Sequence, residues 1–189
     1  MSLGLYLHIP YCFSKCRYCD FYSHPGERGV PEAYVDALVR ELDRFAPEAP
    51  LQPDTLYFGG GTPSLLRPEQ AKRLIDAARP MPGAEITLEA NPETVTEESL
   101  AGFREAGVNR ISFGVQSARD TQLRTLGRPH TAKQARAAFA AAQRAGFANI
   151  SGDIMLALPH YTEAEFDETL ELIEGGGATH ISAYLLKIE

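Results

Sequence analysis

The chain lacks tryptophan, has only three cysteines, and contains no apolar run approaching the roughly 20 residues of a membrane-spanning helix. Basic residues are also scarce, since 18 Lys and Arg stand against 25 Asp and Glu and leave a net charge of −7. Nucleic-acid-binding proteins carry a basic surface, so we expect no nucleic-acid partner. We likewise expect no transmembrane segment and no secretory signal peptide, because His8 and Pro10 interrupt the N-terminal apolar stretch and no basic residue precedes it.

The composition is typical of one folded domain, with 44% hydrophobic and 23% charged residues over 189 positions. Short β-type runs alternate with amphipathic stretches along the whole length. The strands predicted from these runs are 5–9, 55–58, 85–89, 110–115, 150–156 and 180–185. The predicted helices are 31–45, 68–78, 97–106, 132–145 and 163–174, with a short further helix at 118–126.

This alternation predicts an α/β protein with a parallel sheet and right-handed crossovers. Six strands and five main crossover helices fall short of the eight units of a closed barrel. A doubly wound sheet and an incomplete barrel both accommodate this number of units, and spacing alone does not separate them. Several strands read as nearly continuous apolar runs, which is typical of a sheet covered by helices on both faces or curled into a barrel.

The last residues, Leu185–Glu189, fall inside or just after the sixth predicted strand, and no helix follows to cover it. An uncovered edge strand favours association between molecules. We therefore expect a chain truncated after its sixth strand, with an exposed apolar edge over Ile181–Leu186.

All three cysteines, Cys12, Cys16 and Cys19, lie within eight residues in the loop after the first strand. An odd, clustered set does not make a disulfide framework and indicates a metal or redox site in a reducing compartment, so we expect a cytoplasmic protein. A structural zinc site needs a fourth ligand, for which His24 or His130 would serve. A [4Fe–4S] cluster with three thiolates leaves one iron open for a substrate or cofactor, and this interpretation fits the missing fourth cysteine better.

Further motifs follow in order, most of them where a predicted strand ends. They are LYLHIPYC at 5–12, GGGTPS at 59–64, EANP at 89–92, GVQS at 114–117 and GDIMLALP at 152–159. Together with C-x3-C-x-Y-C at 12–19, they resemble the radical SAM superfamily and, within it, the oxygen-independent coproporphyrinogen III oxidase group. That group includes the radical SAM haem chaperones (HemW-like proteins). The resemblance covers essentially all of residues 1–189, as one radical SAM core domain.

The resemblance implies an incomplete (β/α)6 barrel, of which a C-terminal region or a substrate closes the lateral gap. It implies that Cys12, Cys16 and Cys19 bind a [4Fe–4S] cluster, whose open iron chelates the amino and carboxylate groups of S-adenosylmethionine (SAM). An electron donor reduces the cluster, and cleavage of SAM then gives a 5′-deoxyadenosyl radical. The residues that the resemblance assigns to cofactor binding are Tyr6, Tyr18, Gly60, Gly61, Thr62, Glu89, Gln116, Arg128 and Asp153.

The residue types suit these implied roles. A guanidinium fork matches a carboxylate, the role that the resemblance gives to Arg128. A carboxylate such as Asp153, set within an apolar strand, is costly to bury without a polar partner. Glycines such as Gly60 and Gly61 at a strand end permit close backbone approach to a ligand. No catalytic residue is assigned.

Two functions in the haem pathway fit the resemblance. One is a haem chaperone that delivers haem to acceptor proteins; the other is an oxidase that decarboxylates the propionates of coproporphyrinogen III. Asp20 and Phe21 directly follow the third cysteine, where the oxidases have a further cysteine, and the cluster begins at residue 12 without their N-terminal extension. Both features favour the chaperone. A zinc-binding module is a third, weaker interpretation.

The chaperones' own haem-binding motif, with His-Asn and a downstream Tyr-Trp, belongs to a C-terminal region. This sequence has no Trp and contains no such motif. Haem is therefore expected as the cargo of the full-length protein, and we assign no haem ligand within these residues.

Overall fold

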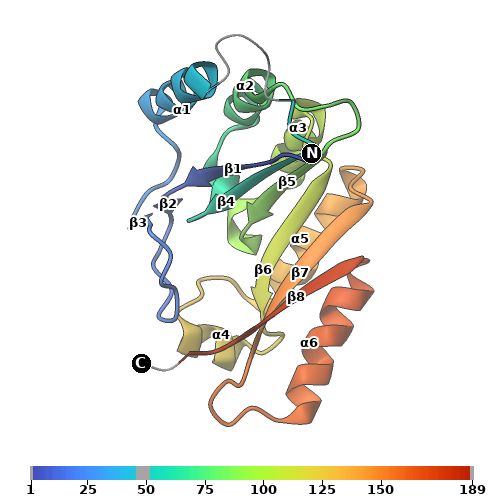
Figure 1. The fold of residues 1–189 in the computed structure, drawn as a ribbon. Coiled ribbons are helices and arrows are strands. Elements are labelled where there is room, and N and C mark those ends of the chain that lie inside the picture. The colour runs from blue at the N-terminus through green and yellow to red at the C-terminus, as the bar shows by residue number, and fades with distance from the viewer. Residues whose placement is uncertain (1, 46–51, 188–189) are drawn as a thin grey trace.

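Residues 2–45 and 52–187, which the computed structural model describes, fold around one six-stranded parallel sheet (Figure 1). The strands follow one another across the sheet in chain order: β1 (Gly4–Ile9), β4 (Thr55–Gly60), β5 (Glu85–Ala90), β6 (Arg110–Gln116), β7 (Asn149–Leu156) and β8 (His180–Leu185). A doubly wound sheet reverses its strand order part-way, so that alternative is excluded. Among the described residues, β1 and β8 form the two edges without pairing to each other, which confirms the incomplete (β/α)6 barrel.

Helices connect the strands and begin within two residues of their predicted positions. They are α1 (Glu32–Phe45), α2 (Pro68–Ala78), α3 (Glu97–Ala106), α4 (Asp120–Leu126), α5 (Ala132–Arg144) and α6 (Glu163–Gly175). A capping box precedes α6: the Thr162 hydroxyl accepts a hydrogen bond from the Glu165 N–H at 3.4 Å, and the Thr162 N–H donates to the Glu165 carboxylate at 3.0 Å. α4 begins later than predicted because residues 117–119 form a turn, in which the Ser117 hydroxyl accepts a hydrogen bond from the Arg119 N–H at 3.0 Å.

Short elements complete the carboxyl edge of the sheet. Two single-turn 3-10 helices, η1 (Pro63–Leu65) and η2 (Pro92–Thr94), follow β4 and β5. The two-residue strands β2 (Tyr11–Cys12) and β3 (His24–Pro25) pair with each other and close the loop that carries the cysteines. This pairing holds the two ends of the loop together beside the end of β1.

The two faces of the sheet differ in polarity. On the outer face, Phe58, Leu88, Phe113 and Ile150 are buried under the helices, which Figure 1 shows along one side of the curved sheet. Residues paired across parallel strands point to the same face. By this register the inner face carries Tyr6, Tyr57, Glu89, Ser112, Asp153 and Ser182. In the described residues the helices cover one face of the sheet only. The nearly continuous apolar runs of the strands therefore reflect a curled sheet and not a sheet covered by helices on both faces. The inner face is left for polar ligands.

The outermost strand has the exposed apolar residues that the sequence predicted. Ile181, Tyr184 and Leu185 on β8 are 48%, 54% and 74% exposed. The expected truncation after the sixth strand was based in part on Ile188 and Glu189. These two residues lie outside the described residues. None of the helices in the described ranges has the length and apolar character to cross a membrane.

Candidate functional site

A cavity of about 440 Å³ lies at the carboxyl ends of the strands, the position at which α/β folds place their sites. It is lined by the loop after β1, by residues at the ends of β4 to β7, and by the segment after α4. Every residue predicted to bind metal or cofactor lines it except Tyr6. These lining residues are Cys12, Cys16, Tyr18, Cys19, Gly60, Gly61, Thr62, Glu89, Gln116, Arg128 and Asp153.

Tyr6 lies on β1 outside the cavity wall and is 53% exposed. Its ring stacks on that of Tyr57, with 5.9 Å between the ring centroids. The Tyr57 hydroxyl in turn donates a hydrogen bond to the Glu89 carboxylate at 2.8 Å. Tyr6 is thus connected to the site through Tyr57, and its own contact with a cofactor stays a prediction.

The cysteine loop is fixed against two neighbouring elements. The Arg17 N–H donates a hydrogen bond to the Leu126 carbonyl, at the end of α4, at 3.0 Å. On the opposite side, the Thr62 hydroxyl donates to the Cys12 sulfur at 3.5 Å. These bonds hold the loop over the ends of β4 and α4, so that the cysteines face the same cavity.

The three cysteines carry free thiols. Burial raises the pKa of the Cys16 thiol, and the positive charge of Arg128 acts in the opposite direction. Binding of a metal to this thiol therefore displaces a proton.

Two glycines allow the cysteine loop to pack on the end of β4. Gly60 has a φ of +116°, in the region that side-chain-bearing residues rarely adopt. A Cβ atom on Gly61 would lie 2.7 Å from the Tyr11 carbonyl oxygen and 3.0 Å from the Cys12 sulfur. The GGG motif is therefore required for packing as well as for the approach of a ligand.

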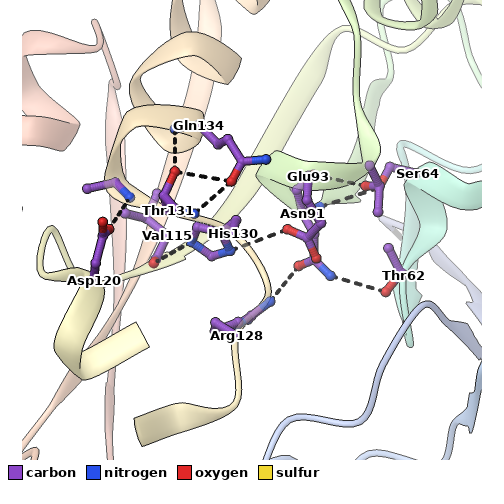
Figure 2. Close-up of polar contacts among 12 residues, drawn as sticks. Thr62, Ser64, Asn91, Glu93, Val115, Asp120, Arg128, His130, Thr131 and Gln134 are labelled. Atoms are coloured by element: carbon purple, nitrogen blue, oxygen red, sulfur yellow. Dashed lines mark hydrogen bonds and ion pairs between the residues drawn. The ribbon is translucent and has the colours of Figure 1, made fainter. Parts of the chain in front are cut away.

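Arg128 stands at the centre of a polar group on the cavity wall. Its Nη1 donates to Asn91 Oδ1 at 2.7 Å, and its Nε donates to the Tyr18 hydroxyl at 2.9 Å. Asn91 Nδ2 donates in turn to the Thr62 hydroxyl at 3.2 Å (Figure 2). Gly114 leaves room for this group, because a Cβ atom there would lie 2.9 Å from Arg128 Nη2. The guanidinium is thereby fixed where a ligand carboxylate can meet its fork.

Gln116 ends β6 in a strained turn. Its φ is 66°, and the Ser117 N–H donates to the Val115 carbonyl at 2.8 Å, which closes a three-residue turn around it. The residue is 5% exposed, and its Oε1 has no hydrogen-bond partner among the described residues. A buried amide oxygen without a partner destabilises the fold, so Gln116 fits a ligand that donates a hydrogen bond from the cavity.

Two carboxyl groups share the inner wall of the cavity. Burial raises the pKa of both Glu89 and Asp153. Hydrogen bonds oppose this shift: Glu89 accepts from the Tyr57 hydroxyl and, at 3.3 Å, from the Gly60 N–H, and Asp153 accepts from the Ser112 hydroxyl at 3.1 Å. A cationic ligand between the two carboxylates would favour their charged forms.

The raised pKa of Asp153 predicts that Asp153→Asn stabilises the ligand-free protein, and more so as the pH rises. The unfolded carboxyl ionises at a pH of about 3.9, whereas the folded one keeps its proton to higher pH. The free energy of unfolding of the wild type therefore falls as the pH rises from that value through the raised pKa, and the neutral amide removes this fall. Chemical denaturation at about pH 4 and about pH 7 measures the difference. An advantage of the variant that does not grow between the two pH values would contradict the expectation.

The cavity fits a [4Fe–4S] cluster better than a single metal ion. Cysteine thiolates are the ligands that iron–sulfur clusters take. In the described ranges, no three His, Cys, Asp or Glu side chains lie close enough together to hold one ion, as a structural zinc site requires. A four-iron cluster is larger and joins thiolates that are farther apart. His130, considered as a fourth zinc ligand, has its ring nitrogens directed at the Val115 carbonyl and the Glu93 carboxylate instead.

The rest of the cavity fits SAM. The unpartnered amide oxygen of Gln116 accepts a hydrogen bond, the Arg128 fork suits a carboxylate, and the Glu89 and Asp153 carboxylates suit an ammonium group. SAM carries all three kinds of partner.

An open parallel β/α barrel with three cysteine thiols at its carboxyl edge, beside an arginine and two partly buried carboxyl groups, defines an iron–sulfur protein with a charged organic cofactor. A family model described as the Radical SAM superfamily matches residues 6–173, which is more than half of the chain. The chain belongs to the radical SAM superfamily. Membership implies a [4Fe–4S] cluster and SAM as cofactors.

Individual relatives confirm the narrower resemblance. The heme chaperone HemW of Escherichia coli (strain K12) is 40% identical, over 99% of this chain and 51% of that protein. The heme chaperone HemW of Bacillus subtilis (strain 168) is 38% identical, over 97% and 50%. The structure of coproporphyrinogen III oxidase (HemN) from Escherichia coli, a radical SAM enzyme, has a TM-score of 0.85 at 28% identity, over 98% of this chain and 44% of that one. The chain spans about half the length of the curated relatives it matches.

Sequence reasoning missed part of this site. Asn91 stood within the EANP motif, yet its bond to Arg128 was not anticipated. The Tyr57 and Ser112 hydroxyls donate hydrogen bonds to the Glu89 and Asp153 carboxylates. The alternation of side chains along a strand could have identified both residues, because both occupy inward positions of their strands. Gly114 stood within the GVQS motif, but only the packed structure shows which side chains its missing Cβ atom leaves room for.

Proposed function

We propose that residues 1–189 form the radical SAM core of a haem chaperone. In this proposal Cys12, Cys16 and Cys19 hold a [4Fe–4S] cluster, and the cavity beside them binds SAM. The observation that carries the proposal is the convergence in one cavity of every ligand assigned from the motifs except Tyr6. Haem is the cargo of the full-length protein, acceptor proteins receive it, and an electron donor reduces the cluster. An odd, clustered set of three cysteines, which does not make a disulfide framework, supports a reducing location such as the cytoplasm.

The protein's own residues position the cofactor in this proposal. A cluster bound to the three thiolates supplies the electron that cleaves a carbon–sulfur bond of SAM. Arg128 binds the cofactor carboxylate, and Gln116 Oε1 accepts a hydrogen bond from an ammonium or hydroxyl group of the cofactor. Glu89 and Asp153 accept hydrogen bonds from its ammonium or hydroxyl groups. Tyr18, fixed by Arg128 at 2.9 Å, lies on the same wall and packs near the adenine.

The relatives favour the chaperone over the oxidase. Those named heme chaperone are 40% and 38% identical to this chain, whereas the coproporphyrinogen III oxidase structure is 28% identical. Asp20 and Phe21 also occupy the loop position where the oxidases have a further cysteine. Radical decarboxylation of coproporphyrinogen III is the second candidate, and the TM-score of 0.85 to that oxidase is the observation in its favour.

An anaerobic assay with haem and with coproporphyrinogen III separates the two candidates. The reconstituted full-length protein, supplied with SAM and a reductant, is expected to bind haem and pass it to a haem-free acceptor. It is expected to release no carbon dioxide from coproporphyrinogen III, because a chaperone does not cleave propionates. Haem transfer is followed by visible absorption and carbon dioxide by isotope release from labelled propionates. Stoichiometric decarboxylation without haem transfer would establish the oxidase instead.

A further inference from the structure

Two chain segments, 91–93 and 128–130, face each other at two points two residues apart (Figure 2). The first is the bond of 2.7 Å between Arg128 and Asn91, which both line the cavity. The second joins His130 and Glu93, with 3.3 Å between Nδ1 and Oε2. Neither His130 nor Glu93 lines the cavity, so this second contact lies behind the wall that the first one forms.

The two ring nitrogens of His130 face different partners. Its Nε2 is 3.2 Å from the Val115 carbonyl oxygen, which only accepts, so Nε2 must donate. Its Nδ1 lies 3.3 Å from Glu93 Oε2, and neither of these two atoms has a hydrogen-bond partner among the described residues. The two side chains form an ion pair when the imidazole is protonated.

The pair is buried and acts on two functional residues. The His130 side chain is fully buried and that of Glu93 is 11% exposed, so breaking the pair leaves an unpaired group inside the fold. Through the Val115 carbonyl, His130 contacts the turn that sets the strained φ of 66° at Gln116. Through the chain, it stands two residues from Arg128.

We propose that Glu93 and His130 form a positioning pair that holds Arg128 and Gln116 in the orientation that binds SAM. The inference rests on the proposed function of the cavity. Arg128 and Gln116 touch the cofactor, and the pair acts only through them. Its contribution is to keep the cavity wall in the binding geometry before the cofactor arrives, which lowers the cost of ordering these side chains on binding.

Two variants of nearly equal size at position 93 isolate the polar contact with His130. Glu93→Gln and Glu93→Met remove the same charge, but only the Gln amide can donate to Nδ1 of a neutral imidazole. In the reconstituted protein we expect Glu93→Met to raise the Kd for SAM about tenfold, and Glu93→Gln to stay within about twofold of the wild type, because one buried hydrogen bond separates them. His130→Leu is expected to behave like Glu93→Met. Iron content should match the wild type in all three.

A control and an independent readout complete the test. Gln70, buried in α2 outside the cavity, donates to the Val30 carbonyl at 2.9 Å, so Gln70→Leu lowers stability without changing the Kd. In the metal-free protein, the NMR shifts of the His130 ring nitrogens should differ between Glu93→Gln and Glu93→Met, because only the Gln amide can donate to Nδ1. The Arg128 Nε–H should exchange with solvent faster in Glu93→Met than in Glu93→Gln.

The outcomes separate the inference from the function on which it rests. Equal Kd values for Glu93→Met and the wild type, or an equal loss in Glu93→Gln and Glu93→Met, would overturn the positioning pair. If the wild type itself binds no SAM, the proposed function fails, and the exchange rate of the Arg128 Nε–H then decides. Faster exchange in Glu93→Met alone supports the pair, and equal exchange in both variants refutes it.

Discussion

Replacing Cys16 by serine is expected to abolish assembly of the iron–sulfur cluster, with iron falling from about four atoms per chain to near zero after anaerobic reconstitution. Three thiols supply all the protein ligands in this account, so the loss of one leaves two irons of the cluster without a protein ligand. The thiol of Cys16 also lies between the other two in the sequence and lines the cavity. Iron and sulfide analysis, together with the visible absorption of the cluster, measures the effect.

Ser14→Ala is the matched control for this experiment. Ser14 belongs to the same loop and lines the same cavity, but it offers no thiolate. This variant should keep the full iron content. An iron–sulfur cluster that survives in Cys16→Ser, or a wild-type chain that takes up stoichiometric zinc and no iron, would show that the three cysteines do not form this site.

Arg128→Lys is expected to weaken SAM binding by about a hundredfold while leaving the iron content unchanged, and Arg128→Ala by at least as much. The charge-assisted, two-pronged contact of a guanidinium with a carboxylate is lost in both, although Lys keeps the positive charge. Arg128 also orders Asn91 and Tyr18 through its bonds of 2.7 and 2.9 Å. Equilibrium binding to the reconstituted protein gives the Kd values.

Arg124→Ala controls for loss of an arginine from the same region, because Arg124 is exposed on α4 and does not line the cavity. Its Kd for SAM should equal that of the wild type. Asp153→Ala is the companion variant, at a lining residue of β7, and is also expected to weaken binding. Unchanged affinity in both Arg128→Ala and Asp153→Ala would mean that SAM binds elsewhere.

The fold was largely predictable because each strand and helix carries its own local signal. All six strands of the main sheet and all six α-helices were expected. Apolar periodicity and helix caps, such as that at Thr162, depend only on residues that are neighbours in the sequence. The end of β4 was not. Gly59 and Gly60 pair with His8 and Ile9 and extend the strand, but glycines have no side chains from which periodicity can be read.

Of the site, only the residues assigned to contact the metal or the cofactor could be predicted from the sequence. Arg128 and Asp153 were assigned to the cofactor because the resemblance to the radical SAM superfamily implies cofactor contacts at these positions, and their residue types suit those roles. The pair of Glu93 and His130 was not, because its meaning depends on a contact of 3.3 Å between segments that the sequence separates by more than one βα unit. His130 was considered only as a metal ligand, and a buried imidazole between a carbonyl and a carboxylate has no signature in the sequence.

Electron paramagnetic resonance of the reduced, reconstituted protein, recorded before and after adding SAM, tests the central claim most directly. A cluster held by only three thiolates leaves one iron open, and a cofactor that binds this iron changes its electronic environment. The account predicts the signal of a reduced [4Fe–4S] cluster, which changes on SAM addition in the wild type and does not change at the same SAM concentration in Arg128→Ala. A cluster signal that saturating SAM leaves unaltered in the wild type would contradict it.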